Sequence, residues 1–357
     1  MTLWPRRHSC IGVGLSGRLI STAQLSWPVL GHGRVGQRVE AAASVARAGA
    51  GPWTGRDVES LAGLLERAGF EGTRVVVAPG RGGVVVQPLE LPPRSSGAPL
   101  AQIARAEMAR VLRADPASIE VAMWDVPPPV RAGNASHVMA ACLSQRASEE
   151  LAMMFEGVGL EVVAIDTRSL SLARAARAWL EPTGVCMIVD VSWEGVSVIV
   201  TVGSRVVFER DVDQVSPAKM CESAAARWRL DEATIAMALL RPELESSAQI
   251  ANLAGSAVRE FIEEIVPEIA RSAAYAAHRY PSAKLAKVFL CGEWGGIGGL
   301  KERVEQKLHA PARVLGGGDA MDVGPCVSGA NMGPGSLLAL GLALHPAHAT
   351  HTQGEAA

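Results

Sequence analysis

The chain has 357 residues, 48% of them hydrophobic, so it is long enough for two domains with buried cores and too apolar to be disordered. Its formal net charge is -2, from 34 Lys and Arg against 36 Asp and Glu, and its basic residues form no block longer than Arg6-Arg7. An extended phosphate-binding face is therefore not expected, and we expect no nucleic acid among the partners.

The six cysteines show none of the spacings of a zinc site or a redox motif, and Cys142, Cys186 and Cys291 lie in apolar runs. We expect them to be reduced core residues, which suits the cytoplasm. No uninterrupted run of about 18 apolar residues is present, and Arg6 and Arg7 precede no proper signal-peptide core. These features predict a soluble protein that is not exported.

The first 83 residues are dominated by short apolar runs rich in β-branched residues, which predict strands. The expected order is strand, strand, strand, helix, strand. These elements are expected at residues 10–15, 19–25, 34–43, 58–65 and 74–78. The helix is expected to stop at Gly69, because glycine readily adopts the left-handed conformation of a C-terminal cap.

Residues 84–158 have a different character and predict a small inserted α+β module. Its strands are expected at residues 84–91, 119–126 and 136–142, and its helices at 100–112 and 147–155. After it, a strand at 161–165 and a helix at 170–179 return to the pattern of the first block.

The most apolar stretch of the chain is residues 184–212. Residues 185–191 form an almost unbroken apolar run, and every second residue from Val196 to Val202 is valine, which predicts two strands joined by a tight turn. A third strand is expected at 205–209. Asp190 is the only acid within the apolar part, at the expected end of the first strand, where it either caps the turn or binds a ligand.

The last third of the chain alternates helices with glycine-rich loops. Helices are expected at residues 217–228, 231–240, 243–280, 300–308 and 336–344, a strand at 287–291, and loops at 292–299, 316–318 and 324–335. The long helix has room for a kink at Pro267, since an interior proline removes a backbone hydrogen bond. Residues from 345 onward are expected to form a frayed tail.

Three turns are candidates for binding. In residues 12–18, a strand turns back through small residues that let backbone N–H groups approach an anion, or forms an ordinary hairpin. In residues 190–192, a strand-end carboxylate could hold a metal-bound water or cap the turn. Residues 291–296 lie between a strand and a helix, where helix N-terminal amides could meet a nucleotide. Their spacing is not that of the dinucleotide motif G-x-G-x-x-G.

Together these features resemble the actin-like ATPase superfamily, and more narrowly the PilM family of cytoplasmic type IV pilus assembly proteins, which are related to FtsA. The resemblance extends over residues 9–345. It is carried by residues 86–92 (VQPLELP), 188–191 (IVDV), 268–272 (EIARS), 288–292 (VFLCG) and 338–344 (LALGLAL).

The resemblance implies an α/β, actin-like fold with two ribonuclease-H-like lobes and an inserted module. The expected boundaries are 8–83 and 159–182 for the first lobe, 84–158 for the module, 183–315 for the second lobe, 316–345 for a closing loop and helix that return to the first lobe, and 346–357 for the tail. It also implies a site for ATP and Mg²⁺, with Asp190 at the metal. The nucleotide-binding positions, if retained, are Gly12, Ser16, Gly17, Arg18, Asp190, Val191, Ser192, Glu268, Arg271, Gly292, Glu293 and Gly295.

Several of these positions depart from the family pattern. Gly14 stands where the family has an acid, Ser16 and Ser192 replace turn glycines, and Glu293 replaces a glycine. In addition, Trp193 replaces a small residue. Hydrolysis needs a carboxylate that positions the magnesium shell and the attacking water, so we assign no catalytic residue. Arg18 could partly compensate by pairing with a phosphate.

The sequence therefore predicts a cytoplasmic adapter with a degenerate nucleotide site. The resemblance implies that it binds the short N-terminal tail of a PilN-like inner-membrane protein, and that it meets other pilus or secretion components. Two alternatives stay open, a slowly hydrolysing ATPase of the same assembly and a small-molecule kinase of the same superfamily, and so does a homo-oligomer. Direct membrane insertion is not expected, because residues 346–357 lack an amphipathic apolar face.

Overall fold

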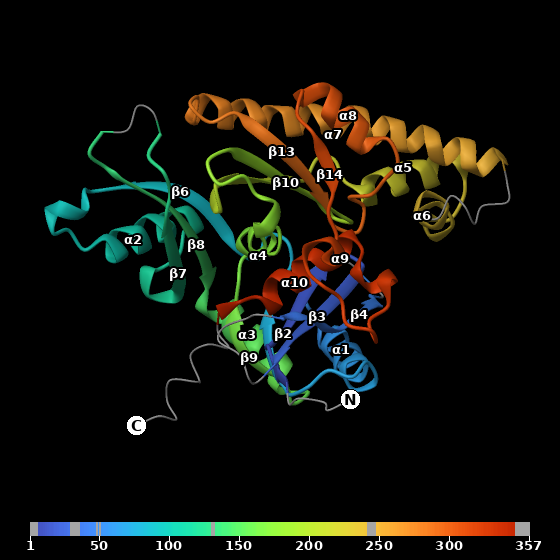
Figure 1. Cartoon of the computed structure of the whole chain (residues 1–357), viewed down its shortest axis with the longest axis horizontal. Helices are drawn as coiled ribbons and strands as arrows, with labels where there is room; N and C mark the ends of the chain where they lie inside the picture. Colours follow the sequence, from blue (N-terminus) through green and yellow to red (C-terminus); the bar gives the residue numbers. More distant parts are fainter. Residues whose placement is uncertain are drawn as a thin grey trace.

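Two sheets with the same strand order form the two lobes of the molecule (Figure 1). The computed structural model describes residues 6–28, 36–47, 49, 51–129, 133–240 and 248–346. The sheets read β4-β3-β2-β5-β9 and β12-β11-β10-β13-β14, and in each an antiparallel group of three strands is followed by two parallel strands. The repeated order indicates that the lobes are related units.

The first sheet also carries a short strand at the edge, β1, paired with β3. Its strands are β1 (Arg6–His8), β2 (Ile11–Ser16), β3 (Leu19–Pro28), β4 (Arg38–Ala46), β5 (Arg74–Val77) and β9 (Glu161–Ile165). The second sheet contains β10 (Val185–Ser192), β11 (Gly195–Val202), β12 (Arg205–Val212), β13 (Leu285–Cys291) and β14 (Ala312–Val314).

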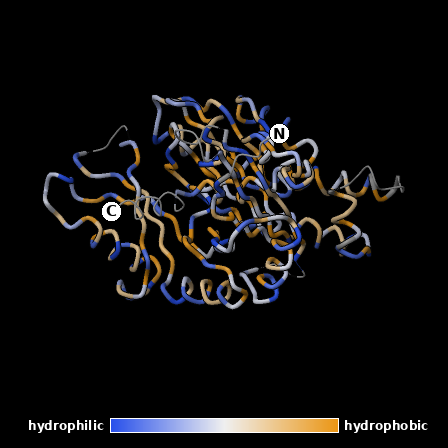
Figure 2. Tube along the Cα trace, turned by 60° about the horizontal axis from the view of Figure 1, so that its bottom comes forward, coloured by the Kyte–Doolittle hydropathy of each residue, from blue (hydrophilic) through white to orange (hydrophobic). Residues whose placement is uncertain are grey.

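The central strand β10 is buried along its whole length, which explains its apolar sequence. One face of it, which includes Met187 and Val189, belongs to a core shared with the second-lobe helices. The other face, which includes Cys186 and Ile188, packs toward the first lobe. Figure 2 shows hydrophobic residues gathered in the interior of the molecule. Because side chains alternate along a strand, Asp190 lies on the same face of β10 as Cys186 and Ile188.

The helices divide between the two lobes. Those of the first lobe are α1 (Gly55–Arg67), α3 (Gln145–Glu156), α4 (Arg168–Ala175) and α10 (Leu337–Ala343). Those that follow the second-lobe hairpins are α5 (Pro217–Trp228), α6 (Glu232–Leu240), α7 (Ala248–Arg279), α8 (Leu300–Leu308) and the short α9 (Gly317–Ala320). Single 3₁₀ turns lie at Arg94–Ser96, Pro116–Ser118, Arg177–Trp179, Gly329–Met332 and Pro334–Ser336. Among the described helices, none is long and apolar enough to cross a membrane.

A third, antiparallel sheet lies to one side of the lobes, at the left of Figure 1. It consists of β6 (Val85–Leu91), β8 (Ser136–Ser144) and β7 (Ile119–Asp125), in that order, and α2 (Leu100–Leu112) packs on it. The sheet is tied to the second lobe, because the indole N–H of Trp124 donates to the carbonyl oxygen of Val206, 2.8 Å away.

The structure corrects several expectations. The predicted boundary at residue 158 places the helix after β8 in the inserted module, but Leu151 and Phe155 of α3 belong to the first-lobe core with Trp53 and Leu61. Sequence adjacency to β8 is the reason for the error. The helix expected at 170–179 ends at Ala175 and continues as a 3₁₀ turn.

Other differences are smaller. The segment expected to be a loop at 316–318 begins α9, because the Asp319 carboxylate accepts a hydrogen bond from the Gly316 N–H, 2.9 Å away. Helix α7 passes through Pro267. The first residues of the strand expected from 34, the start of the helix expected from 243, and the tail from 347 lie outside the described residues.

Helix α10 fixes the first lobe by direct backbone contacts, which glycines make room for. A Cβ on Gly341 would lie 1.9 Å from the carbonyl oxygen of Ser171 in α4, and a Cβ on Gly12 would lie 2.1 Å from that of Ala339. Gly12 therefore serves the contact between β2 and α10.

We expect Gly341→Ala to lower the free energy of unfolding by about 3 kcal/mol, because backbone atoms would have to separate to admit the methyl group. Gly255→Ala is the matched helical control: among the described residues, and apart from the backbone of its own helix, its added Cβ would have only Nη1 of Arg259 within 4 Å, at 3.5 Å. That variant should be unchanged or slightly more stable. Urea unfolding measures both, and equal stability of the two variants would contradict the close packing of α10.

Candidate functional site

The turn of the β2–β3 hairpin meets the turn of the β10–β11 hairpin between the lobes. A Cβ on Gly17 would lie only 2.7 Å from the Cβ of Trp193. The sequence predicts that these two turns face a triphosphate. In the structure they touch each other directly.

Glu293, in the loop after β13, joins the two hairpins. Its Oε1 accepts a hydrogen bond from the Trp193 N–H at 2.8 Å and one from the Ser16 hydroxyl at 3.1 Å. Burial raises the pKa of Glu293, while the hydrogen bonds from Trp193 and Ser16 oppose that rise. A phosphate at the two hairpin turns would be repelled by Glu293, because the carboxylate itself lies against both turns.

Asp190 is held by an arginine that the sequence analysis did not single out. Nη1 of Arg168, at the start of α4, lies 2.6 Å from Asp190 Oδ2, and both side chains are at least 89% buried, with 11% and 2% exposed. Nη2 of Arg168 donates to the carbonyl oxygen of Leu15 at 2.5 Å, and the Ser192 hydroxyl donates to Asp190 Oδ1 at 3.1 Å. Burial acts to lower the pKa of Arg168, but Asp190, together with Asp211 and Cys291, raises that pKa above its ordinary value.

Arg18 lies at the mouth of the same cleft. Its guanidinium stacks on the Trp193 ring, 3.9 Å from the centroid, and pairs with Glu232 of α6 at 2.5 Å. The predicted role of Arg18 as a phosphate partner is therefore not seen, because these two groups already engage its charge.

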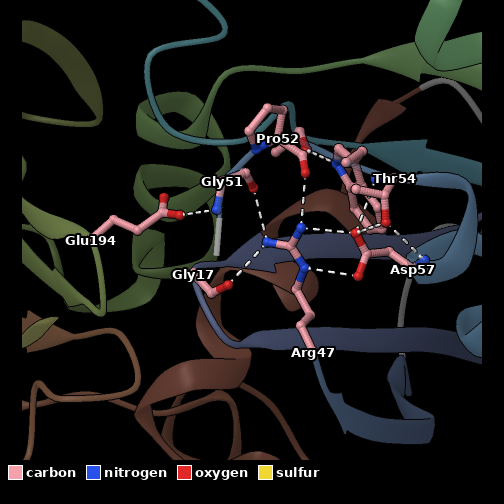
Figure 3. A network of polar contacts seen from close by, with 9 residues as sticks. Gly17, Arg47, Gly51, Pro52, Thr54, Asp57 and Glu194 are labelled. Atoms are coloured by element: carbon pink, nitrogen blue, oxygen red, sulfur yellow. Dashed lines mark hydrogen bonds and ion pairs between the residues drawn. The ribbon is translucent and has the colours of Figure 1, made fainter. Parts of the chain in front are cut away.

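A buried arginine network supports the first hairpin turn (Figure 3). Arg47 donates to the carbonyl oxygen of Gly17 at 2.9 Å and forms a bidentate pair with Asp57 at 3.0 and 2.8 Å. Burial alone would raise the Asp57 pKa, but hydrogen bonds from Arg47 and Thr54 lower it. Glu194 of the second hairpin accepts from the Gly51 N–H, so the network also spans the lobes.

Two further glycines of the predicted site, Gly292 and Gly295, lie where a side chain would collide with neighbouring atoms. Gly292 has a φ of 85°, and a Cβ there would lie 2.3 Å from Asp190 Oδ1. A Cβ on Gly295 would lie 2.3 Å from the Cys291 carbonyl oxygen. The Val191 carbonyl oxygen accepts from the Trp294 N–H at 3.0 Å, which fixes the loop after β13 against the hairpin.

Glu268 and Arg271 do not join this cluster. Glu268 pairs with Arg210 of β12 at 2.7 Å and with Arg271. Their helix, α7, packs through Ile265 and Ile269 on the face of the second sheet opposite the cleft. The prediction that this motif borders a nucleotide in the cleft is therefore not supported by the geometry.

The residues present do not fit ATP and Mg²⁺. The cavity that remains beside Ser16, Asp190 and Gly292 has a volume of about 10 Å³, whereas small-molecule sites usually have 300 Å³ or more. The only acid of the two hairpin strands that faces the cleft, Asp190, already has a cationic partner. We therefore assign no metal or nucleotide to this cleft.

A second buried acid lies nearby on β12. Glu209 Oε2 is buried and has no hydrogen-bond partner among the described residues. It lines a cavity of about 30 Å³ together with Arg81, Arg168, Ser197 and Asp211. The pKa of Glu209 is raised to about 7, chiefly by burial and to a smaller extent by Asp211, while a hydrogen bond from Ser169 and the charges of Arg168 and Arg81 oppose the rise.

We expect Arg168→Met to lower the free energy of unfolding by about 3–5 kcal/mol, because Asp190 would remain buried without its counter-charge. The double variant Arg168→Met/Asp190→Asn should recover much of this loss, since it also removes the charge. Arg303→Met is the control, because its ion pair with Glu263 is exposed. Chemical unfolding checks the cycle. A single-variant loss no larger than that of the control would contradict the importance of the buried pair.

Glu209 should make stability depend on pH. Its raised pKa means that the folded chain keeps a proton that the unfolded chain releases, so the free energy of unfolding falls as pH rises from about 4.5 to about 7. Relative to Glu209→Gln, the wild type should lose about 3 kcal/mol across this window. Unfolding at a series of pH values measures the difference. Parallel profiles, or an equal effect of Glu302→Gln on the surface, would contradict it.

Comparisons with known proteins agree with the described geometry. A chain described as "PilM-PilN type IV pilus biogenesis complex" aligns with 94% of this chain and 98% of its own, at 21% identity and a TM-score of 0.76. The ethanolamine utilization protein EutJ from Carboxydothermus hydrogenoformans aligns with 96% of this chain and 91% of its own, at 13% identity and a TM-score of 0.53. These likenesses confirm the predicted actin-like α/β fold.

A comparison with curated proteins gives no match. The family described as "Type IV pilus assembly protein PilM" matches residues 64–347, which is most of the chain. The predicted resemblance is confirmed, and the chain belongs to the PilM family of type IV pilus assembly proteins.

Proposed function

We propose that the protein is a cytoplasmic adapter of a type IV pilus or type II secretion-like assembly. It binds the short N-terminal tail of a PilN-like partner, which recruits it to the inner membrane. Membership of the PilM family supports this proposal, as does the similarity to a chain from a PilM–PilN complex. The observation that carries the adapter role over an enzymatic one is the direct contact between the two hairpin turns at Gly17 and Trp193.

The chemistry of the cleft also favours binding over turnover. Gly14 offers no carboxylate, and the side chain of Leu338 would lie 3.0 Å from a Cβ placed there. Asp190 is neutralised by Arg168. In the described part of the cleft, the two hairpins therefore offer no uncompensated carboxylate to position a metal shell or an attacking water. The alternatives of a slow ATPase and a small-molecule kinase gain no support from this arrangement.

The groove between the first lobe and the inserted module is the proposed place for the partner tail. Gly80, Val84 and Val86 line the small cavity beside Arg81, about 30 Å³ in volume, which Ser197, Glu209 and Asp211 of the second lobe also line. We propose the two valines as contacts for the tail. Half-buried valines beside polar groups suit an extended peptide that supplies apolar side chains and backbone hydrogen-bonding groups.

We expect Val84→Asp to weaken binding of a PilN-like tail peptide by about ten-fold or more, because a carboxylate would be desolvated against it. Val323→Asp is the matched control, since Val323 is 36% exposed and pairs with the distant strand β4. Fluorescence anisotropy with the labelled tail measures both. If the wild type does not bind the tail, the adapter proposal fails. If Val84→Asp binds as tightly as Val323→Asp, the proposed groove is wrong.

A further inference from the structure

The loop after β13 places the carboxylate of Glu293 in the cleft. The Trp193 N–H and the Ser16 hydroxyl are donors of the kind that bind phosphoryl oxygens, and the Glu293 carboxylate accepts from both. A carboxylate oxygen offers the same lone pairs and the same charge sign as a phosphate oxygen. Glu293 therefore occupies the donors of the two hairpins that an anionic ligand would otherwise bind.

The matching cation is also part of the chain. Arg168 places its guanidinium between Asp190 Oδ2 and the Leu15 carbonyl oxygen, at 2.6 and 2.5 Å. These two oxygen acceptors come from the two hairpin strands, β10 and β2. Such oxygens would attract a metal ion bound to a nucleotide. Here Arg168 already donates to both of them and balances the charge of Asp190.

These contacts cross from one lobe to the other. Ser16 and Arg168 belong to elements of the first lobe, whereas Asp190, Trp193 and Glu293 belong to the second. The two links, Ser16 with Glu293 and Arg168 with Asp190, are buried or nearly so. Buried charge-assisted contacts of this kind hold elements together more firmly than exposed ones.

We propose that Ser16, Arg168, Asp190, Trp193 and Glu293 form an internal latch that keeps the two lobes closed without nucleotide. The chain supplies both the anion and the cation that ATP and Mg²⁺ would bring. This inference deepens the proposed adapter function, because the partner then meets one fixed arrangement of the lobes.

Further contacts around the latch also hold the two lobes together. Arg81, 10% exposed, reaches from the first lobe to Asp211 and Asp213 at 3.1 Å each, and donates to the Val196 carbonyl oxygen at 2.9 Å. At the opposite rim, Arg18 pairs with Glu232. The latch is thus enclosed by further links between the lobes.

The test compares the wild type with Glu293→Ala by hydrogen exchange and small-angle X-ray scattering. In the wild type, MgATP should change neither the radius of gyration nor exchange at residues 16–18 and 193–194. Glu293→Ala leaves the Trp193 N–H without its acceptor, so exchange at these residues should quicken about ten-fold or more, and the radius of gyration should increase.

Chemical rescue makes the test specific for an anion site. Sodium acetate or inorganic phosphate should slow the exchange of Glu293→Ala toward the wild-type rate, and sodium chloride at equal ionic strength should not. Glu302→Ala, at an exposed acid near the same loop, is the matched control and should behave as wild type. Glu293→Gln, which keeps the side-chain shape, should lie between wild type and Glu293→Ala.

A decrease in the radius of gyration of the wild type on addition of MgATP would overturn the latch. So would a Glu293→Ala variant with the radius of gyration and exchange of the control. Exchange in Glu293→Ala that acetate and phosphate do not slow would also overturn it. These results are distinct from the tail-binding assay. A chain that binds the PilN-like tail but closes only with MgATP would refute the latch and leave the adapter function standing. A chain that is latched but does not bind the tail would do the reverse.

Discussion

A buried ion pair between Arg168 and Asp190 joins the two lobes inside the cleft. A carboxylate that is only 2% exposed at the end of a fully buried strand cannot remain charged without a partner of opposite charge. The partner comes from the other lobe, and its second N–H group binds the first hairpin strand at Leu15. Arg168 of the first lobe thereby supplies the counter-charge for Asp190 of the second lobe.

The same cleft explains why the chain can keep an actin-like fold while its binding loops diverge. The fold needs the two hairpins, the loop after β13 and helix α10 to pack closely, and glycines such as Gly12, Gly292 and Gly341 are retained for backbone contacts. These contacts do not require a nucleotide. Ser16 and Glu293, which the resemblance to the family assigns to a nucleotide, bond to each other instead, and Glu293 also accepts from Trp193 of the second hairpin.

The fold could be predicted largely because its strands carry strong local patterns. The alternating valines of β11 have the two-residue period of a strand, and the apolar run of β10 is short and rich in β-branched residues, which favours a buried strand. Asp190 stands out as its single acid. The position of α3 could not be predicted in the same way. Its amphipathic pattern shows that it packs on something, but not whether that surface is β8's sheet or the first lobe.

The site was harder to predict than the fold. Asp190 was identified as the acid that ends an apolar strand, and Ser16 and Glu293 as departures from the family pattern. The structure brings the three close together. Arg168 was missed, since an arginine in the first turn of a helix usually points to solvent, and only the three-dimensional path of α4 directs it inward. Glu268 and Arg271 were included through a motif, yet the motif alone does not say which face of the second sheet the helix covers.

The contact between Gly12 and Ala339 can form only late in synthesis of the chain. Strand β2 emerges early from the ribosome, but its packing partner α10 follows more than three hundred residues later. Because domains tend to fold as soon as their residues are available, β10 to β14 have all emerged before α10 can cover the first sheet. During synthesis the apolar face that α10 covers therefore stays exposed until nearly the whole described chain has been made, and a chaperone could protect it.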